Sequence, residues 1–489
     1  MNEEKFKELK KNTPELIMFL KEMPKGGDLH NHSLGGGYAE IIYEKAIKNN
    51  DFYDLRTHKF LNKKEYENSD KKEKIISLKL LEKNYIKDYF DNYSIRGLKN
   101  KKDGANHFFN TFTNVLSTKI TEEELILEIL KRNQMENMSY VEMISDCVPT
   151  NLIEKFKASF DIDEAFNLNK IKNYCEILEK NITRENIFKL NLFLDSREKF
   201  LKKNGINHVE VGYMPYLRRM TCDFEEFFIE AYLFILSSCW DSRIVGVNVV
   251  EIEDSLEARR NFQGQLQILK YLYEYFKNMF PEKEINLSIH AGELTIERET
   301  LENMQDRIVS TIFLTRNKEK REHPIAKRIG HGVSVQWETK ETLEIMSRNK
   351  IPVEICLTSN EIVLGISGKN HPFNLYKKYN VPMVICTDDE AVSRGNIVIE
   401  YLKAIERYDI NYSELKCLIK NSLEYSFLEG ESLYVNKNCK IFRSEFSGIN
   451  TIEELEKRII ANKNLISLNK KLKIQLELEK KILEFERNY

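Results

Sequence analysis

The stretch Pro382-Met383-Val384-Ile385-Cys386-Thr387-Asp388-Asp389 decides the fold that this sequence predicts. It is a short apolar run that ends in two adjacent carboxylates, and runs of this length are typical of buried strands. In α/β barrels such strands are covered on both faces, and the residues at their C-terminal ends carry the chemistry. Neighbouring strand residues point to opposite sides, so Asp388 and Asp389 are expected to differ in role, one binding a metal and the other facing a ligand. The alternative is a strand that ends in a solvated acidic turn.

Histidines occupy comparable positions earlier in the chain. His30 and His32 are two residues apart, so on a strand they share a face and lie close enough to bind one ion. His290 and His331 each end a further apolar run. The alternatives are that His30 and His32 are an incidental surface pair and that His331 is only a turn residue. The presence of all four histidines favours a functional role.

Glu293 follows His290 by three residues, after a glycine that lets the backbone turn. A glutamate near a metal but not bound to it is suited to act as an acid or a base, because burial raises its pKa towards the working pH. The alternative is a glutamate at a helix start that interacts favourably with the helix dipole.

Strand and helix patterns alternate along most of the chain. Helical periodicity covers 121–136, 163–181, 223–238 and 300–316, and this alternation predicts a parallel sheet. Polar residues cluster after the first, fifth, sixth and eighth strands, which is the distribution that an active site at the C-terminal face of a (β/α)8 barrel requires. The predicted strands begin near residues 28, 139, 207, 243, 285, 326, 351 and 381.

The expected domains are an N-terminal helix over 1–22, a barrel over 23–450 and a helical tail over 451–489. The N-terminal helix is expected to restart at Thr13-Pro14, a cap followed by a first-turn proline. Roughly a hundred residues, about 41–138, separate the first two strands and predict an inserted helical subdomain or lid. The tail, which has no Pro or Gly, is expected to be one long helix or a helical hairpin.

Composition argues against several classes of protein. Among 489 residues, 75 Lys and Arg nearly balance 77 Asp and Glu, so the formal net charge of -2 disfavours a nucleic-acid binder driven by bulk charge. No stretch approaches the ~18 apolar residues of a membrane span, and Met1 to Lys21 lacks the apolar core of a signal peptide. The eight cysteines are scattered without a CxxC pair, so we expect a cytoplasmic protein with buried thiols.

With these motifs assembled, the chain resembles the adenosine deaminase family of the amidohydrolase superfamily, over about residues 22–435. The opening motif and the long insertion look like the adenosine-deaminase-growth-factor-like branch. The resemblance implies a TIM barrel of the metal-dependent hydrolase type. The matching motifs, in family order, are Met23-Pro24-Lys25-Gly26, His30-Asn31-His32, His290-Ala291-Gly292-Glu293, Gly330-His331-Gly332, Glu354-Ile355-Cys356 with Thr358-Ser359-Asn360 and Gly365, and Thr387-Asp388-Asp389.

The resemblance implies one Zn²⁺ per chain and a water molecule that the ion activates. Three imidazoles and one carboxylate with an open position suit a catalytic zinc site, where the metal lowers the pKa of the water towards ~7. Asp388 is then both a ligand and a catalytic residue. The implied ligands are His30, His32, His290 and Asp388.

Three further residues have roles by similarity. His331 is implied to be the base and electrostatic partner of the water, and Glu293 to protonate purine N1, which makes C6 electrophilic. Asp389 is implied to hydrogen-bond purine N7. Because an ionised carboxylate and N7 are both acceptors, one of the two groups must carry a proton.

Two substrate-binding positions depart from the family. The best-known adenosine deaminases have a ribose-binding aspartate two residues after the second metal histidine, where this chain has Leu34. They also have a glycine after the fourth strand, whose amide contacts purine N3, where this chain has Glu251. Glu390 stands where the family often has proline, which we interpret as a loop difference.

The leading hypothesis is zinc-dependent hydrolytic deamination of adenosine or 2′-deoxyadenosine to inosine or 2′-deoxyinosine plus ammonia. A deaminase of another 6-aminopurine, such as adenine, AMP or a modified nucleoside, is the alternative within the class. A non-catalytic binding or assembly protein on the same barrel is the alternative outside it. The expected partner is a small-molecule purine nucleoside, with no nucleic acid and no membrane. The insertion or the C-terminal helix offers a route to a homo-oligomer, while packing of the tail against its own barrel is the alternative.

Overall fold

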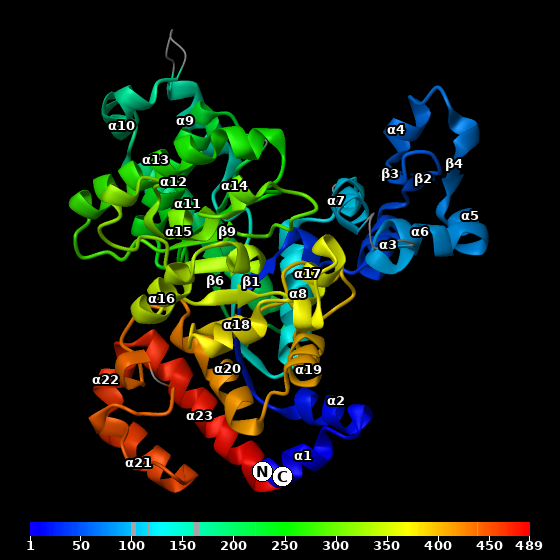
Figure 1. Ribbon diagram of the computed structural model, residues 1–489. Helices are drawn as coiled ribbons and strands as arrows, with labels where there is room; N and C mark the ends of the chain where they lie inside the picture. Colours follow the sequence, from blue (N-terminus) through cyan, green and yellow to red (C-terminus); the bar gives the residue numbers. More distant parts are fainter. Residues whose placement is uncertain (99–103, 116, 161–165, 221, 438) are drawn as a thin grey trace.

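Parallel strands form a barrel at the centre of the computed structural model (Figure 1). The structure describes all residues except 99–103, 116, 161–165, 221 and 438. Two parallel sheets run in the orders β1-β5-β6 and β12-β11-β10-β9-β8-β7. The strands are β1 Lys25–His32, β5 Met138–Ile144, β6 Glu210–Met214, β7 Tyr216–Arg218, β8 Val247–Val250, β9 Leu287–Ala291, β10 Arg328–His331, β11 Val353–Ile355 and β12 Met383–Ile385.

Two isolated bridges join the sheets and close the barrel. Asn31 of β1 pairs with Asp388 just after β12, and Tyr213 of β6 pairs with Ile244 before β8. β6 and β7 are successive segments of one stave, interrupted at Pro215, which has no amide hydrogen to donate. The barrel thus has eight staves within the described residues. The predicted (β/α)8 fold is confirmed, with strand boundaries shifted by a few residues.

Helices follow the strands and cover the outside of the barrel (Figure 1). α12 corresponds to the predicted helix 223–238, and it is apolar on nearly every side because it packs against α9, α11 and α13. These helices are α8 Glu122–Met135, α9 Thr150–Ser159, α10 Ile171–Glu179, α11 Arg184–Lys203, α12 Phe224–Trp240, α13 Leu256–Met279, α14 Leu301–Met304, α15 Arg307–Phe313, α16 Lys340–Asn349, α17 Leu357–Leu364, α18 Phe373–Lys378, α19 Ile397–Tyr408 and α20 Tyr412–Glu424.

Two predicted helices differ from the structure in their extent. The helix expected over 163–181 is observed as α10, and the first part of the prediction, 163–165, lies outside the described residues. The helix expected over 300–316 is divided into α14 and α15. Asp306 leaves helical geometry there with φ of -141° and its carboxylate binds Arg316 at 2.8 Å.

The insertion after β1 forms a separate lobe beside the barrel (Figure 1). It is largely helical, as expected, but it also contains a three-stranded antiparallel sheet in the order β3-β2-β4, which the sequence analysis does not predict. Each of these strands has three residues, too few for an alternating pattern to be recognised. The elements are α3 Ala39–Asn49, β2 Phe52–Asp54, β3 Lys59–Leu61, α4 Lys63–Glu67, β4 Ile75–Ser77, α5 Leu78–Leu80, α6 Ile86–Asn92 and α7 Gly104–Val115.

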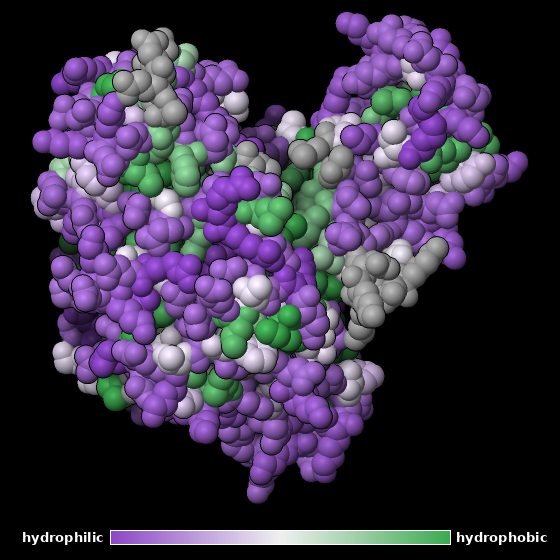
Figure 2. Space-filling view, turned by 45° about the horizontal axis from the view of Figure 1, so that its top comes forward, coloured by the Kyte–Doolittle hydropathy of each residue, from purple (hydrophilic) through white to green (hydrophobic). Residues whose placement is uncertain are grey.

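The lobe has its own aromatic core, in which the rings of Tyr53, Phe60 and Tyr89 contact one another. Figure 2 shows a deep notch between the lobe and the body of the protein. α7 is the last helix of the insertion and packs against α17 of the barrel. The insertion therefore ends on the rim of the barrel.

The two terminal segments pack together on the opposite end of the molecule from the insertion (Figure 1). The N-terminal segment forms two helices, α1 Glu3–Leu9 and α2 Thr13–Glu22, and Asn12 rather than Thr13 caps the second. The tail is a helical hairpin of α21 Ile452–Ala461, α22 Lys463–Ser467 and α23 Lys470–Asn488, and α23 packs against α20 and β1. No helix among the described residues has the length and apolar character needed to cross a membrane.

A buried ion-pair network crosses the interior of the barrel. The guanidinium of Arg328 on β10 lies 2.5 Å from Glu142 of β5 and 2.5 Å from Glu354 of β11. Its carbon Cζ also lies 3.6 Å from the centre of the Phe427 ring. Burial opposes the charge of Arg328, but the two carboxylates raise its pKa above the usual value. One cation thus pairs with two carboxylates, and the pairs connect three staves.

We predict that Arg328→Met destabilises the fold by about 3–5 kcal/mol, because it leaves two buried carboxylates without a counter-charge. Urea unfolding gives the free-energy difference. Arg394→Met is the control: Arg394 pairs with Glu40 at the partly exposed surface, and its loss is expected to cost at most about 1 kcal/mol. Equal stability of the two variants would contradict the structural role of Arg328.

Candidate active site

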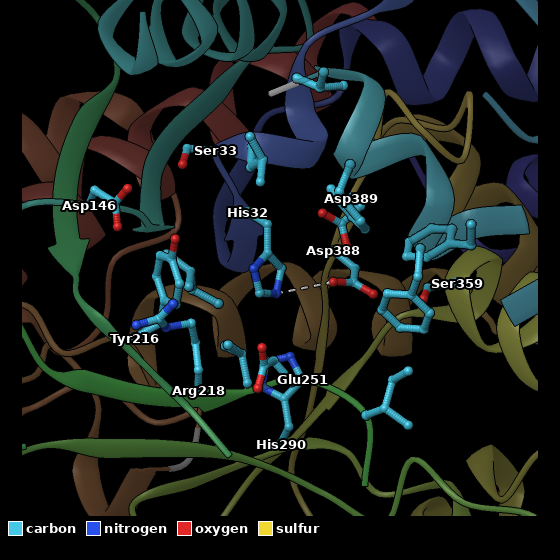
Figure 3. Close-up of a pocket in the computed structure, with 18 of the residues that line it drawn as sticks. His32, Ser33, Asp146, Tyr216, Arg218, Glu251, His290, Ser359, Asp388 and Asp389 are labelled. Atoms are coloured by element: carbon cyan, nitrogen blue, oxygen red, sulfur yellow. Dashed lines mark ion pairs between the residues drawn. The ribbon is translucent and has the colours of Figure 1, made fainter. Parts of the chain in front are cut away.

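The predicted metal ligands converge at the C-terminal ends of β1, β9 and β12. His32 Nε2 lies 3.3 Å from His30 Nε2 and 3.3 Å from Asp388 Oδ1, and His30 Nε2 lies 3.5 Å from Asp388 Oδ1. The His290 ring centre is 4.4 Å from that of His30. Figure 3 shows His32, His290 and Asp388 around one point of the cavity.

These separations fit a bound metal ion. Donor atoms about 2.0–2.1 Å from a tetrahedral ion lie about 3.3 Å from one another, which matches the spacing around His32. Two groups that share Asp388 have all their donor atoms within 4.8 Å of one another. One group is His30, His290, His331 and Asp388, and the other is His32, Asp388 and Asp389. The nitrogen and oxygen donors suit a borderline cation such as zinc.

Two histidines are oriented by residues behind them. His30 Nδ1 lies 2.7 Å from Glu354 Oε2, and His290 Nδ1 lies 2.9 Å from Asn248 Oδ1. An acceptor on Nδ1 holds the proton there and leaves the Nε2 lone pair free for a metal. Burial opposes ionisation of Glu354, but Arg328 and His30 lower its pKa to about 2.

The sequence analysis assigned no role to Glu354 or Asn248. A usable signal was present: each is a polar residue within an otherwise apolar strand, flanked by Val353 and Ile355 or by Val247 and Val249. A polar side chain on a strand that is buried on both faces needs a partner inside the protein.

Three of the predicted site residues have left-handed backbone conformations. His331, Asp388 and Glu251 have φ of 64°, 60° and 76°; His331 ends β10, Glu251 directly follows β8, and Asp388 lies three residues after β12. Such conformations are unfavourable for residues other than glycine and tend to occur at functional sites. Gly35 is required for a different reason, because a Cβ there would overlap the carboxylate of Asp389.

The two adjacent aspartates have opposite protonation. Burial opposes ionisation of Asp388, but the surrounding histidines, first His30, hold its pKa well below the usual range. Burial and the charge of Asp388 raise the pKa of Asp389 well above its usual range. These surroundings therefore favour the ionised form of Asp388 and the protonated form of Asp389.

Glu293 is also neutral. Burial, followed by the charges of Asp388 and Glu253, raises its pKa to about 8. Its backbone is fixed because the Glu293 amide donates to Glu253 Oε1 at 2.8 Å, and Arg307 holds Glu253 at 2.7 Å. Glu293 Oε1 lies 3.8 Å from His331 Nδ1. A protonated carboxylic acid thus stands beside the cluster of histidines.

A cavity of about 650 Å³ opens over this cluster. The apolar part of its lining includes Phe108, Phe109 and Phe112 of α7, so the insertion contributes to the site. Leu34 and Glu251, the two departures from the family pattern, also line it. Glu251 Oε2 accepts a hydrogen bond of 2.8 Å from the Met220 amide, so this carboxylate takes part in loop structure.

Polar residues gather on one side of the cavity. Ser33, Asp146, Tyr216 and Arg218 lie on the side of His32 opposite to Ser359 (Figure 3). Asp146 follows the second stave, and Tyr216 and Arg218 lie within the third, on β7. Asp146, Tyr216 and Arg218 are not recognisable as candidates from the sequence, because they belong to no motif of characteristic spacing.

Comparisons with known proteins agree with this geometry. A sequence profile of the family described as "Adenosine deaminase" matches residues 318–434. The adenosine deaminase of Clostridium acetobutylicum is 26% identical over 314 residues, which cover 58% of this chain and 86% of that protein. The adenosine deaminase-like protein of Caenorhabditis elegans is 37% identical over 102 residues, which cover 20% of this chain and 26% of that protein.

Solved structures share the fold. The structure of Arabidopsis ADAL complexed with GMP superposes with a TM-score of 0.52 at 16% identity, covering 84% of this chain and 94% of that one. The adenine deaminase of Arthrobacter aurescens gives a TM-score of 0.50 at 13% identity, covering 83% of this chain and 94% of that one.

We predict that Glu354→Gln weakens metal binding about 10- to 100-fold, because a neutral amide no longer polarises His30. Competition with a chromophoric chelator measures the affinity. Asn370→Gln, on a surface turn before α18, is the control and is expected to bind metal as the wild type does. Unchanged affinity in Glu354→Gln would mean that the hydrogen bond to His30 does not tune the ligand.

Proposed function

The chain belongs to the adenosine deaminase family of metal-dependent aminohydrolases, and we propose that it deaminates adenosine and 2′-deoxyadenosine with one Zn²⁺ per chain. The observation that carries this proposal is the convergence of His30, His32, His290 and Asp388 at one point of the cavity, with the carboxyl groups of Glu293 and Asp389 beside them. Hydrolysis of an amino group from a purine needs an activated water on one face of C6 and proton donors at the ring nitrogens on either side.

His30, His32, His290 and Asp388 would hold the ion. When bound, zinc supplies a water of lowered pKa at neutral pH. The protein's own contribution is to fix the four donors from three staves and to shield them from solvent.

Glu293 and Asp389 would orient the purine. A proton from Glu293 to N1 makes C6 electrophilic, and the proton on Asp389 donates to N7. N1 and N7 flank C6 on opposite sides, so these two contacts direct C6 towards the histidine cluster. After water adds to C6, the amino group leaves as ammonia and the ring keeps the oxygen.

The polar side of the cavity supports a nucleoside rather than a nucleotide. With C6 directed at the histidines, N9 points away from them, and the acidic residues that line the cavity include Asp146 and Glu122, of which Glu122 is paired with Arg197 at 2.8 Å. The cation on this side, Arg218, already lies 3.3 Å from Glu230 and 3.5 Å from Glu226. A phosphate would meet like charges, whereas sugar hydroxyls find acceptors.

AMP remains the second candidate substrate. Structures of Arabidopsis ADAL contain GMP or IMP, which shows that this fold accommodates a nucleotide in those proteins. The charge of the cavity in this chain favours adenosine instead.

We predict that the zinc-loaded protein deaminates adenosine and 2′-deoxyadenosine with at least about tenfold higher kcat/KM than AMP, because of the acidic lining. The change in ultraviolet absorbance of the purine is the measurement, with adenine as a third comparison. His30→Ala is the inactive control. Preference for AMP would overturn the substrate, and no turnover of any 6-aminopurine by zinc-bound protein would overturn the proposed activity.

We predict that Glu293→Gln retains zinc and loses at least about 100-fold in kcat, the typical contribution of a positioned acid. Metal content and steady-state rates separate the two effects. Glu297→Gln, an exposed residue four positions along the chain, serves as the matched control. Near-normal turnover in Glu293→Gln would refute the role of Glu293 as the acid.

A further inference from the structure

A chain of hydrogen bonds leads from the backbone at the start of α18 to His331. The Phe373 amide donates to His371 Nδ1 at 3.1 Å. His371 Nε2 lies 3.2 Å from Asn360 Oδ1, and Asn360 Nδ2 lies 3.0 Å from His331 Nδ1. All of these side chains are buried, so solvent does not compete for the bonds.

The first bond in the chain determines the direction of the others. A backbone amide can only donate, so His371 Nδ1 must be the unprotonated nitrogen of its ring. The proton of neutral His371 is then on Nε2, which donates to the Asn360 oxygen. This fixes the orientation of the Asn360 amide, whose nitrogen in turn donates to His331 Nδ1.

These hydrogen bonds require a neutral His371 ring. Burial, with a smaller effect of the nearby Arg407, lowers its pKa to about 3. The ring is therefore uncharged at neutral pH, with one donor and one acceptor nitrogen. Both ring nitrogens of His371 form hydrogen bonds within this chain, so the direction of each bond is fixed.

We propose that His371 and Asn360 are positioning residues that hold His331 as its Nε2–H tautomer. His331 lines the cavity, and its ring centre lies 5.0 Å from those of His30 and His290. With Nδ1 engaged by Asn360, neutral His331 donates a hydrogen bond to the attacking water and does not accept a proton from it. This differs from the role of base that the family resemblance implies, and it rests on the proposed deaminase function.

The test reverses one bond of the chain. In Asn360→Asp the carboxylate still accepts from His371 but can no longer donate to His331, so His331 is expected to place its proton on Nδ1. ¹⁵N NMR of the zinc-loaded protein with labelled histidine distinguishes protonated from unprotonated ring nitrogens, and His331→Gln assigns the signals. Asn411→Asp, at the N-cap of α20 where Asp caps equally well, is the matched control.

Kinetics provide a second measurement. Asn360→Asp is expected to lower kcat for adenosine by at least about tenfold while KM changes little, because His331 is turned from donor to acceptor. His371→Ala should lower kcat similarly. His371→Gln should restore most of it, because a glutamine oxygen and nitrogen can replace the acceptor and donor of the ring. Thermal unfolding checks that each variant is folded.

The proposal is overturned if wild-type His331 carries its proton on Nδ1, or if Asn360→Asp leaves its NMR signals unchanged. It is also overturned if His371→Gln is as slow as His371→Ala in folded protein. Failure of the proposed function gives a different result: the tautomer changes in Asn360→Asp as expected, but no 6-aminopurine is deaminated by the wild type.

Discussion

The contact between β1 and the residues after β12 is the constraint on which the site depends. The Asp388 amide donates to the His30 carbonyl at 2.8 Å, and the His32 amide donates to the Asp388 carbonyl at 3.1 Å. Thr387 Oγ1 reinforces the join by donating to Asp28, and Asn31 Nδ2 donates to Thr387 Oγ1 at 2.9 Å. Because these backbones pair only when the barrel closes, three of the four proposed metal ligands are brought together by the same event that completes the fold.

The ion pairs inside the barrel extend to the candidate active site through Glu354. Arg328 pairs with both Glu142 and Glu354, and Glu354 also accepts a hydrogen bond from His30. Ionised Glu354 increases the electron density on the imidazole, which strengthens a metal bond to its other nitrogen. Glu354 thus takes part both in the buried ion pairs of the barrel and in the orientation of His30. The stability of the fold and the proposed metal affinity therefore depend on the same network.

The sequence predicted those features that depend on local pattern. The staves were recognisable as apolar runs, and the cluster of histidines and aspartates as polar residues at the ends of four of them. It could not predict features that depend on distant partners. The hydrogen bond of Asn248 to His290, the chain from His371 to His331, and the contribution of Phe108 to the cavity each join residues from separate elements. The sheet in the insertion was missed because its strands are too short for periodicity to show.

The insertion has its own hydrophobic core, and α7 contributes a wall to the cavity, whereas the proposed chemistry comes entirely from strand ends of the barrel. The aromatic wall of the cavity and the residues of the proposed reaction therefore belong to different structural units. Mutations in the lobe can reshape the cavity without disturbing the histidine cluster, and mutations in the barrel are constrained by closure and charge. Evolution of such a protein can change the aromatic wall of the cavity while the residues of the histidine cluster are inherited unchanged.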